Sequence, residues 1–446
     1  MNRTSRYFNP LQVALFGGLV VTTATLALLG PGLSRSVRAA LQDSPKTVVD
    51  EAWQLVNQYY VDGTFNQVDW QATRLKLLSK SYTSRQQAYD ALRDALKQLN
   101  DPYTRFMDPD EYVSLTTQTS GELSGIGIRL GTDEKTKALT VVEPIEGSPA
   151  LKAGVQAGDK ILAIDGKSTA KMSIEDASAL IRGKAGTKLT LRLVRKGKAS
   201  FDLPITRALI ELPTVRYAVN REGKNRLGYI RLNEFNAHAT TQIRQAIQKL
   251  EAQNVNAFVL DLRGNPGGLL QASVDISRMW LDKGLIVRTV DRQGNNDKIA
   301  ADHTSLTRLP LVVLVDGNSA SSSEILTGAL KDNHRAMVVG STTFGKALVQ
   351  SVHNLSDGSG LAVTIAHYYT PNGTDISHKG IAPDIQVNLT DAQRQALIAN
   401  PARVATLADP QYAKAVATLE KTILAKPKEA NRAAIPLTSS KETSAR

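Results

Sequence analysis

Four serines lie within five positions in DGNSASSSEIL, residues 316–326. The segment follows the apolar run LPLVVLV and precedes a helix-like pattern, so it joins an expected buried strand to an expected helix. Ser321 and Glu324 have the S-x-x-E spacing of a capping box, and capping alone would explain one serine and the glutamate. A serine hydroxyl can also act as a nucleophile if a base and backbone donors for an oxyanion lie within reach.

Few residues of this chain can serve as that base. There is no cysteine, and none of the six histidines lies in a G-x-S-x-G elbow, because that motif does not occur. Lys346 lies in STTFGKALVQS, a stretch without an acid, where burial would lower its pKa from about 10.4 toward neutrality. Gln350 follows four residues later on the same face and can orient the amine. A lysine among apolar residues also commonly extends its charged end to solvent, so both interpretations stay open.

The two ends of the chain carry most of its charge. The formal net charge is +12, of which residues 1–40 and 421–446 each hold +4, and no basic face interleaved with aromatic residues appears, which speaks against nucleic-acid binding. Residues 1–40 have the basic flank, apolar run and small-residue site of an export signal. The apolar run at residues 11–29 is also long enough for a retained membrane anchor. Both alternatives place the body outside the cytoplasm.

The secondary-structure pattern predicted for the body of the chain changes twice. From Lys46 to about Thr116 the pattern is helical and shows no obvious chemistry, whereas residues 121–206 contain short β-like runs separated by glycines, with two helices among them. From Glu211 onward apolar strands alternate with helices, which predicts an α/β layer with a largely parallel sheet. The loop DLRGNPGG at residues 261–268 and the serine cluster both follow such strands, so we expect them to be neighbours at the carboxyl edge.

The middle region resembles a PDZ domain in its order of strands and helices, and SGIGIRL lies where that family keeps its carboxylate-binding loop. Gly125 and Gly127 let backbone N–H groups turn toward an anion, and a neighbouring strand edge can accept an extended peptide. The resemblance implies that Gly125, Ile126, Gly127 and Ile128 bind the substrate tail. On the glycines alone, a turn without a ligand would be the better interpretation, and the following EGSPALKAGVQAGDKILAIDG favours the PDZ domain.

Several motifs in order make the whole chain similar to the carboxyl-terminal processing (tail-specific) serine proteases. NSASSSE is followed by FGKALVQ, with the lysine 25 positions after Ser321, and DLRGNPGG, YYTPNG and GIAPDI match further motifs of that family. The resemblance covers about residues 45–390. It implies an α/β and α+β multidomain fold with an N-terminal helical cap, a PDZ domain and an α/β catalytic core of the ClpP/crotonase-like type.

The expected ranges are a signal peptide or anchor at 1–40, a helical region at 41–116, a PDZ domain at 117–208, a catalytic domain at 209–395, a helical segment at 396–425 and a disordered tail at 426–446.

Carried over to this sequence, the family pattern makes Ser321 the nucleophile, Lys346 the general base and Gln350 the residue that positions the lysine. The backbone N–H groups of Gly267 and Ser322 would form the oxyanion hole. Many relatives have alanine where this chain has Ser322, so Ser319 and Ser323 remain alternatives for the nucleophile.

The resemblance implies a serine endopeptidase that cleaves exported proteins near their carboxyl termini, in the periplasm or the thylakoid lumen. The partners of such an enzyme would be protein substrates with free C-terminal tails. The resemblance implies no nucleic acid, metal or cofactor, and it is compatible with an oligomer. A catalytically silent PDZ-type scaffold is the alternative from another class, against which the intact set of Ser321, Lys346 and Gln350 speaks. The missing G-x-S-x-G disfavours an esterase or lipase.

Overall fold

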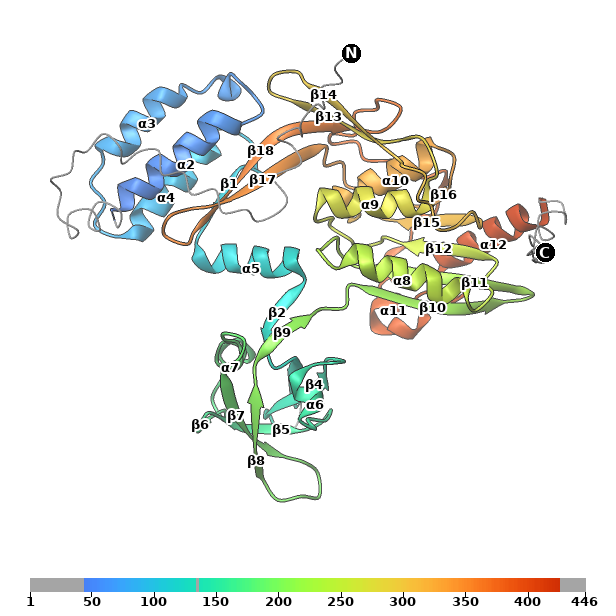
Figure 1. The fold of residues 1–446 in the computed structure, drawn as a ribbon, viewed down its shortest axis with the longest axis horizontal. Coiled ribbons are helices and arrows are strands. Elements are labelled where there is room, and N and C mark those ends of the chain that lie inside the picture. Colours follow the sequence, from blue (N-terminus) through green and yellow to red (C-terminus); the bar gives the residue numbers. More distant parts are fainter. Residues whose placement is uncertain (1–43, 134–135, 426–446) are drawn as a thin grey trace, which may run out of the picture.

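The computed structural model describes residues 44–133 and 136–425, and Figure 1 shows their arrangement. The predicted export segment at residues 1–40, with its apolar run at 11–29, and the predicted tail at 426–446 lie outside the described residues. Within those two ranges, no helix combines the length and the apolar character needed to cross a bilayer. The predicted α/β and α+β multidomain fold is confirmed, with three sheets and a two-stranded ribbon in the described part.

The described chain begins with a group of helices packed against a long hairpin (Figure 1). These helices are α2 (Pro45–Tyr59), α3 (Trp70–Ser79) and α4 (Arg85–Lys97), with a 3-10 turn at Phe65–Gln67. Apolar positions of α2 and α4 recur every three to four residues and are buried together with Leu361 and Val363 of the hairpin. Residues far apart in sequence therefore share this first core.

A short strand, β1 (Arg105–Met107), follows these helices, although the sequence pattern predicted only helix there. It pairs with β18 (Gly360–Tyr369), so that Arg105 lies opposite Ala362. The other strands of this antiparallel five-stranded sheet are β17 (Leu348–Asn354), β13 (Leu285–Asp291) and β14 (Asn296–Ala300). Helix α5 (Pro109–Ser120) comes next and ends at Gly121, whose φ of 68° suits a glycine.

The middle domain projects from the rest of the molecule on the ribbon of β2 (Glu122–Gly125) and β9 (Ala208–Glu211) (Figure 1). Its antiparallel sheet has the order β3-β4-β5-β7-β8, with β6 on β5, and two helices. Their bounds are β3 (Ile128–Thr132), β4 (Leu139–Pro144), β5 (Lys160–Ile164), β6 (Lys167–Ser168), β7 (Lys188–Val194), β8 (Phe201–Thr206), α6 (Pro149–Lys152) and α7 (Ile174–Ile181). This domain has its own apolar core, which includes Ile126, Val141 and Leu191.

A second six-stranded sheet has the order β10-β11-β12-β15-β16-β19 and is parallel except for the antiparallel edge strand β10. Its strands are β10 (Val215–Glu222), β11 (Asn225–Leu232), β12 (Ala257–Asp261), β15 (Leu311–Val315), β16 (Met337–Gly340) and β19 (Ile385–Gln386). Because β12 and β15 are adjacent and parallel, the loops that follow them meet at one edge. The Ala320 N–H donates to the Asn265 carbonyl across these loops (3.0 Å), which confirms that they are neighbours.

Helices cover both faces of this sheet. One face carries α8 (Ala239–Glu251), α9 (Leu270–Trp280) and α10 (Ser322–Asp332). The other face carries α12 (Pro410–Ala425), which follows α11 (Asp391–Ala399) and a 3-10 turn at Pro401–Arg403. Successive residues of β12 alternate between the two cores, since Leu260 packs with the first set and Val259 with α12. This burial on both sides explains the continuous apolar runs.

Candidate active site

Ser321 lies at the turn from β15 to α10 and has an unusual backbone conformation. Its φ of 54° and ψ of −114° are rare for any residue other than glycine and cost on the order of 1–3 kcal/mol. Such a strained strand-to-helix turn is how other hydrolases expose a nucleophilic serine, although the G-x-S-x-G sequence is absent here. The backbone geometry therefore makes Ser321 the candidate nucleophile of this cluster.

The other serines of the cluster hold the neighbouring loop. Ser319 Oγ donates to the Leu262 carbonyl (2.8 Å), Ser322 Oγ to the Gly268 carbonyl (2.9 Å) and Ser323 Oγ to the Asn265 carbonyl (2.9 Å). Ser319 and Ser323 are fully buried, whereas Ser321 lines a cavity. The Ser321 hydroxyl makes no such bond to the loop. Structural roles thus account for Ser319 and Ser323, which favours Ser321 among the three alternatives.

Glu324 connects the serine turn to the lysine segment. Its carboxylate is fully buried and accepts four hydrogen bonds, from the Ser321 and Lys346 N–H groups at Oε2 (2.9 and 3.0 Å) and from Gly345 N–H and Thr343 Oγ1 at Oε1 (both 2.6 Å). Burial raises the pKa of Glu324, while the four donors work in the opposite direction. Its role therefore extends beyond the capping box, because it joins the Ser321 and Lys346 segments.

Lys346 precedes β17 and is half-buried in the same cavity as Ser321. Burial lowers the pKa of its amine to about 8, with the Arg105 charge acting in the same direction and Asp101 opposing it. The Lys346 Nζ lies 4.5 Å from the centre of the Tyr103 ring. The Tyr368 hydroxyl is within hydrogen-bond distance of the Ser321 carbonyl (3.3 Å) and of the Lys346 carbonyl, so it links the two segments.

The cavity has a volume of about 340 Å³ and mostly apolar walls. Helix α5, β1, the loop after β12, the start of α10 and the hairpin β17–β18 contribute its lining. The residues are Tyr103, Arg105, Leu115, Thr119, Pro266, Gly268, Leu269, Leu270, Ser321, Ser322, Ile325, Lys346, Leu348, Val349, Gln350, Val352, Ala362, Ile365 and Tyr368. A cavity of this size accommodates a short stretch of extended peptide.

Gln350 and one of the two predicted oxyanion donors, Gly267, have other partners in this conformation. Gln350 lines the cavity, and its Nε2 donates to Thr364 Oγ1 (3.4 Å). The Gly267 N–H donates to Asn265 Oδ1 (2.9 Å). Gly267 approaches the serine turn so closely that a Cβ there would lie 2.8 Å from the Ala320 carbonyl oxygen. Ser322 is the first residue of α10, where backbone N–H groups lack helical partners.

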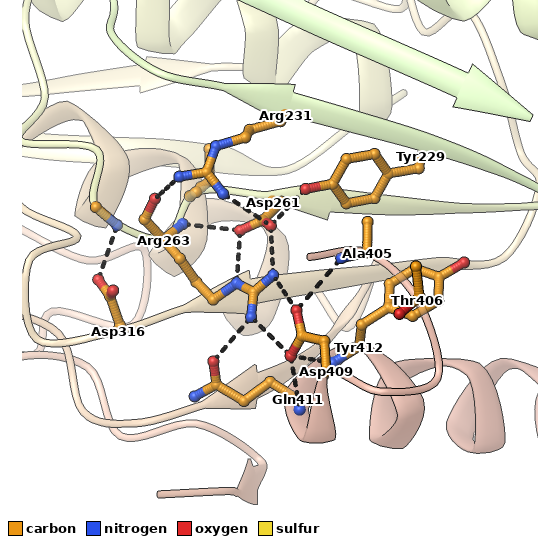
Figure 2. Close-up of polar contacts among 12 residues, drawn as sticks. Tyr229, Arg231, Asp261, Arg263, Asp316, Ala405, Thr406, Asp409, Gln411 and Tyr412 are labelled. Carbon is orange, nitrogen blue, oxygen red and sulfur yellow. Dashed lines mark hydrogen bonds and ion pairs between the residues drawn. The ribbon is translucent and has the colours of Figure 1, made fainter. Parts of the chain in front are cut away.

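Figure 2 shows a network of polar contacts around Asp261 and Arg263, which precede Gly267 in the same loop. The Arg263 guanidinium donates to both oxygens of Asp261 (2.9 and 2.7 Å), and it also contacts Asp409 and Gln411 at the start of α12. Burial alone would raise the pKa of Asp261, but the Arg263 charge and hydrogen bonds outweigh it and hold that pKa below its usual value. Tyr229 donates to Asp261 as well (2.7 Å). The loop is thereby fixed to the C-terminal helix.

The four residues expected to bind a substrate tail lie together in the middle domain. Gly125, Ile126, Gly127 and Ile128 line a small cavity of about 80 Å³ between β3 and α7, next to Arg182. The Ile126 side chain is fully buried in the domain core, so only its backbone is available to a ligand. Gly127 has a φ of 77°, which lets the chain turn there.

Comparison with known proteins identifies the family. The model of peptidase family S41 matches residues 226–387, and that of the PDZ domain matches residues 140–195. The carboxyl-terminal-processing protease of Picosynechococcus sp. is 44% identical over 375 residues, which cover 84% of this chain and 90% of the relative. This chain belongs to the carboxyl-terminal-processing proteases. The predicted family and the PDZ domain are thus confirmed, and the family supports a protease.

Two further relatives of this protease family agree. The chloroplastic C-terminal processing peptidase of Tetradesmus obliquus is 40% identical over 353 residues, which cover 76% of each chain. A solved structure named photosystem II D1 C-terminal processing protease has a TM-score of 0.50 and 40% identity, and the match covers 77% of this chain and 93% of that one. The family therefore includes cyanobacterial and chloroplast processing proteases.

Sequence reasoning missed most of the residues that line the cavity, and three of these interact with Lys346. Tyr103 and Arg105 belong to the region in which only helices without chemistry were expected, and Tyr368 was noted only as part of YYTPNG. The break in the helical pattern at Pro102 was the available signal for a change of structure there. Periodicity gives no information on which distant strand such a segment joins.

Proposed function

We propose that Ser321 and Lys346 form the catalytic dyad of a serine endopeptidase that cleaves protein substrates near their carboxyl termini. The supporting observation is that Ser321, held in a strained strand-to-helix turn, lines the same cavity as a lysine whose pKa burial lowers to about 8. A neutral amine is the form that can accept a proton, and near neutrality a useful fraction of Lys346 is in that form.

In the proposed reaction, neutral Lys346 takes the proton from Ser321 Oγ while Oγ attacks the peptide carbonyl. The tetrahedral oxyanion collapses to an ester on Ser321, and the lysine returns the proton to the leaving amine. Water then attacks the ester with Lys346 accepting its proton, the bond from the acyl carbon to Ser321 Oγ breaks to release the new carboxyl terminus, and Lys346 returns the proton to Oγ. Burial keeps Lys346 poised for both transfers.

The oxyanion would be bound by backbone N–H groups at the serine turn. Ser322 N–H lies at the positive end of α10 and suits this role. We assign the second donor to Gly267, whose N–H becomes available only after its bond to Asn265 Oδ1 opens. Gln350 is assigned to orienting Lys346, which requires its amide to leave Thr364. Substrate binding would then order the site.

The PDZ domain would hold the substrate tail through Gly125, Ile126, Gly127 and Ile128, with backbone N–H groups facing the terminal carboxylate. The cyanobacterial and chloroplast relatives support an exported protein that acts in the periplasm or the thylakoid lumen. The relative named for photosystem II D1 makes a precursor with a removable C-terminal extension the substrate class that we favour.

Cleavage of a peptide with a free C-terminal tail tests the dyad. We expect Ser321→Ala and Lys346→Ala each to lower kcat by at least about 10³-fold, whereas Lys224→Ala, at an exposed turn, should leave the rate unchanged. Labelling of wild-type Ser321 by a fluorophosphonate would exclude a catalytically silent scaffold. Wild-type rates in either dyad variant would contradict the assignment.

A further inference from the structure

The active-site cavity contains two cations and no carboxylate. Its lining includes Arg105 and Lys346, while none of its other lining residues is an aspartate or a glutamate. The proposed mechanism requires Lys346 to be neutral when the reaction begins, so that Arg105 is then the remaining charge in the lining. The role of this charge in the cavity is not explained by the dyad.

Arg105 is exposed and projects from β1 at the cavity wall. It lies opposite Ala362 of β18, which in turn lies opposite Val352 of β17, and all three line the cavity. Directly opposed residues of antiparallel strands point to the same face of the sheet. Three neighbouring strands thus place the arginine on the same wall as the apolar residues.

The two acids whose charges act on Lys346, Asp101 and Glu324, accept hydrogen bonds from other groups. Asp101 accepts from the Tyr103 N–H at Oδ1 (2.9 Å) and from Thr104 Oγ1 at Oδ2 (2.7 Å), and these bonds hold the turn before β1. All four bonds to Glu324 come from the serine turn and the lysine segment. Among the described residues, none forms a hydrogen bond or an ion pair with the Arg105 guanidinium. Its five donors therefore face the cavity or solvent.

We propose that Arg105 is a substrate-binding residue that receives a carboxylate of the peptide lying in the active-site cavity. This inference rests on the proposed function and extends it to the chemistry of the substrate near the cleaved bond. A guanidinium presents two parallel donors that match the two oxygens of a carboxylate, and such charge-assisted pairs are stronger than neutral hydrogen bonds.

The size of the cavity limits where this carboxylate can lie. An extended peptide advances about 3.3 Å per residue, so a cavity of about 340 Å³ holds only a few residues around the bond attacked by Ser321. The carboxylate is therefore an aspartate or glutamate side chain within about three residues of the cleaved bond, or the free terminus of a short tail. Both sources present the same group to Arg105.

Two matched sets of peptides distinguish these sources. In the first set, glutamate is exchanged with glutamine at each of the three positions on either side of the cleaved bond. In the second set, the tail is shortened one residue at a time and carries either a free or an amidated terminus. The kcat/KM of each acidic peptide is divided by that of its amide partner, at a pH about one unit above the pKa of Lys346. This ratio cancels any effect of Arg105 on the amine itself.

We expect the wild-type ratio to be about tenfold or more at one position or one tail length, and to fall to near one in Arg105→Gln. Arg105→Lys should keep part of the preference, because it retains the charge without the planar pair of donors. Arg216→Gln, an exposed arginine of β10 outside the cavity, should keep all of it. The loss should be mainly in KM if the carboxylate is bound equally before and during the reaction.

Two results would overturn this inference. One is a wild-type ratio near one for every peptide, and the other is a preference that persists unchanged in Arg105→Gln. If wild type still cleaves the amide peptides, neither of these two results contradicts the proposed serine protease function. Failure of wild type to cleave any peptide would contradict both the proposed function and this extension.

Discussion

Replacement of Glu324 by glutamine tests whether one buried carboxylate holds the Ser321 and Lys346 segments of the proposed dyad together. The side chains have nearly the same shape, so the change removes charge and two acceptor sites without creating a cavity. The amide oxygen can still accept from one pair of donors, such as Thr343 and Gly345. The new NH₂ group then faces the N–H groups of Ser321 and Lys346, which are also donors.

The expected loss of stability follows from the two broken bonds. Hydrogen bonds to a charged group contribute roughly 1.5–3 kcal/mol each, so their loss alone is worth roughly 3–6 kcal/mol. The amide does not carry the cost of burying a charge, which places the expected change near about 3 kcal/mol. A domain with a free energy of unfolding of about 5–15 kcal/mol would be weakened but would still fold.

Glu324→Gln should also change the pH dependence. Burial is the main reason for the low pKa of Lys346, and the Glu324 charge opposes it by raising that pKa. Without the charge, the pKa should fall further, so the acid limb of the kcat/KM profile should move to lower pH. The maximal rate should decrease at least about tenfold, because Ser321 and Lys346 lose their shared anchor.

Urea denaturation and peptide cleavage between about pH 6 and 10 measure these effects. Glu175→Gln, an exposed glutamate of α7, is the matched control and should change neither quantity. An unfolding free energy and a pH profile equal to those of wild type would refute the role assigned to Glu324.

Three further predictions follow from the site and its support. For wild type with an uncharged peptide, kcat/KM should rise roughly tenfold per pH unit below the Lys346 pKa of about 8 and level off above it. The reason is that only the neutral amine accepts a proton. A flat pH profile would exclude Lys346 as the base. Tyr368→Phe removes the hydroxyl that lies within hydrogen-bond distance of both the Ser321 and the Lys346 carbonyls. It should lower the free energy of unfolding by about 1–3 kcal/mol, measured by thermal unfolding, and should also lower kcat. Wild-type values of both quantities would contradict the link between the two segments. Asp409→Asn removes one of the two carboxylates paired with buried Arg263 and should lower the unfolding free energy by about 3 kcal/mol in urea, and an unchanged value would show that the network is dispensable.

Sequence reasoning predicted the parts of the site that depend on local patterns. Apolar strands followed by polar loops indicated that DLRGNPGG and the serine cluster leave the same edge of a parallel sheet, and the pairing of β12 with β15 confirms this. The choice of Lys346 as a candidate base rested on apolar neighbours and on the absence of a local acid. Its lowered pKa agrees with that expectation.

The remaining features depend on contacts between distant segments. Arg105 reaches the cavity because β1 pairs with Ala362, more than two hundred residues away, and helical periodicity carries no information on that pairing. Glu324 was predicted only as part of a cap, since its bonds to Gly345 and Lys346 arise from tertiary packing. The Asn265 side chain that occupies the Gly267 N–H is likewise visible only in three dimensions.

The chain enters and leaves the PDZ domain at a single point. The Leu212 N–H donates to the Gly121 carbonyl (2.8 Å), and Glu122 pairs directly with Glu211, so the two connections behave as the arms of a hairpin whose tip has been replaced by a domain. A turn of about two to four residues could close the same arms after excision. Because α5 leads into this ribbon and also lines the cavity that contains Ser321, the PDZ domain is joined to that cavity by one short, continuous piece of chain.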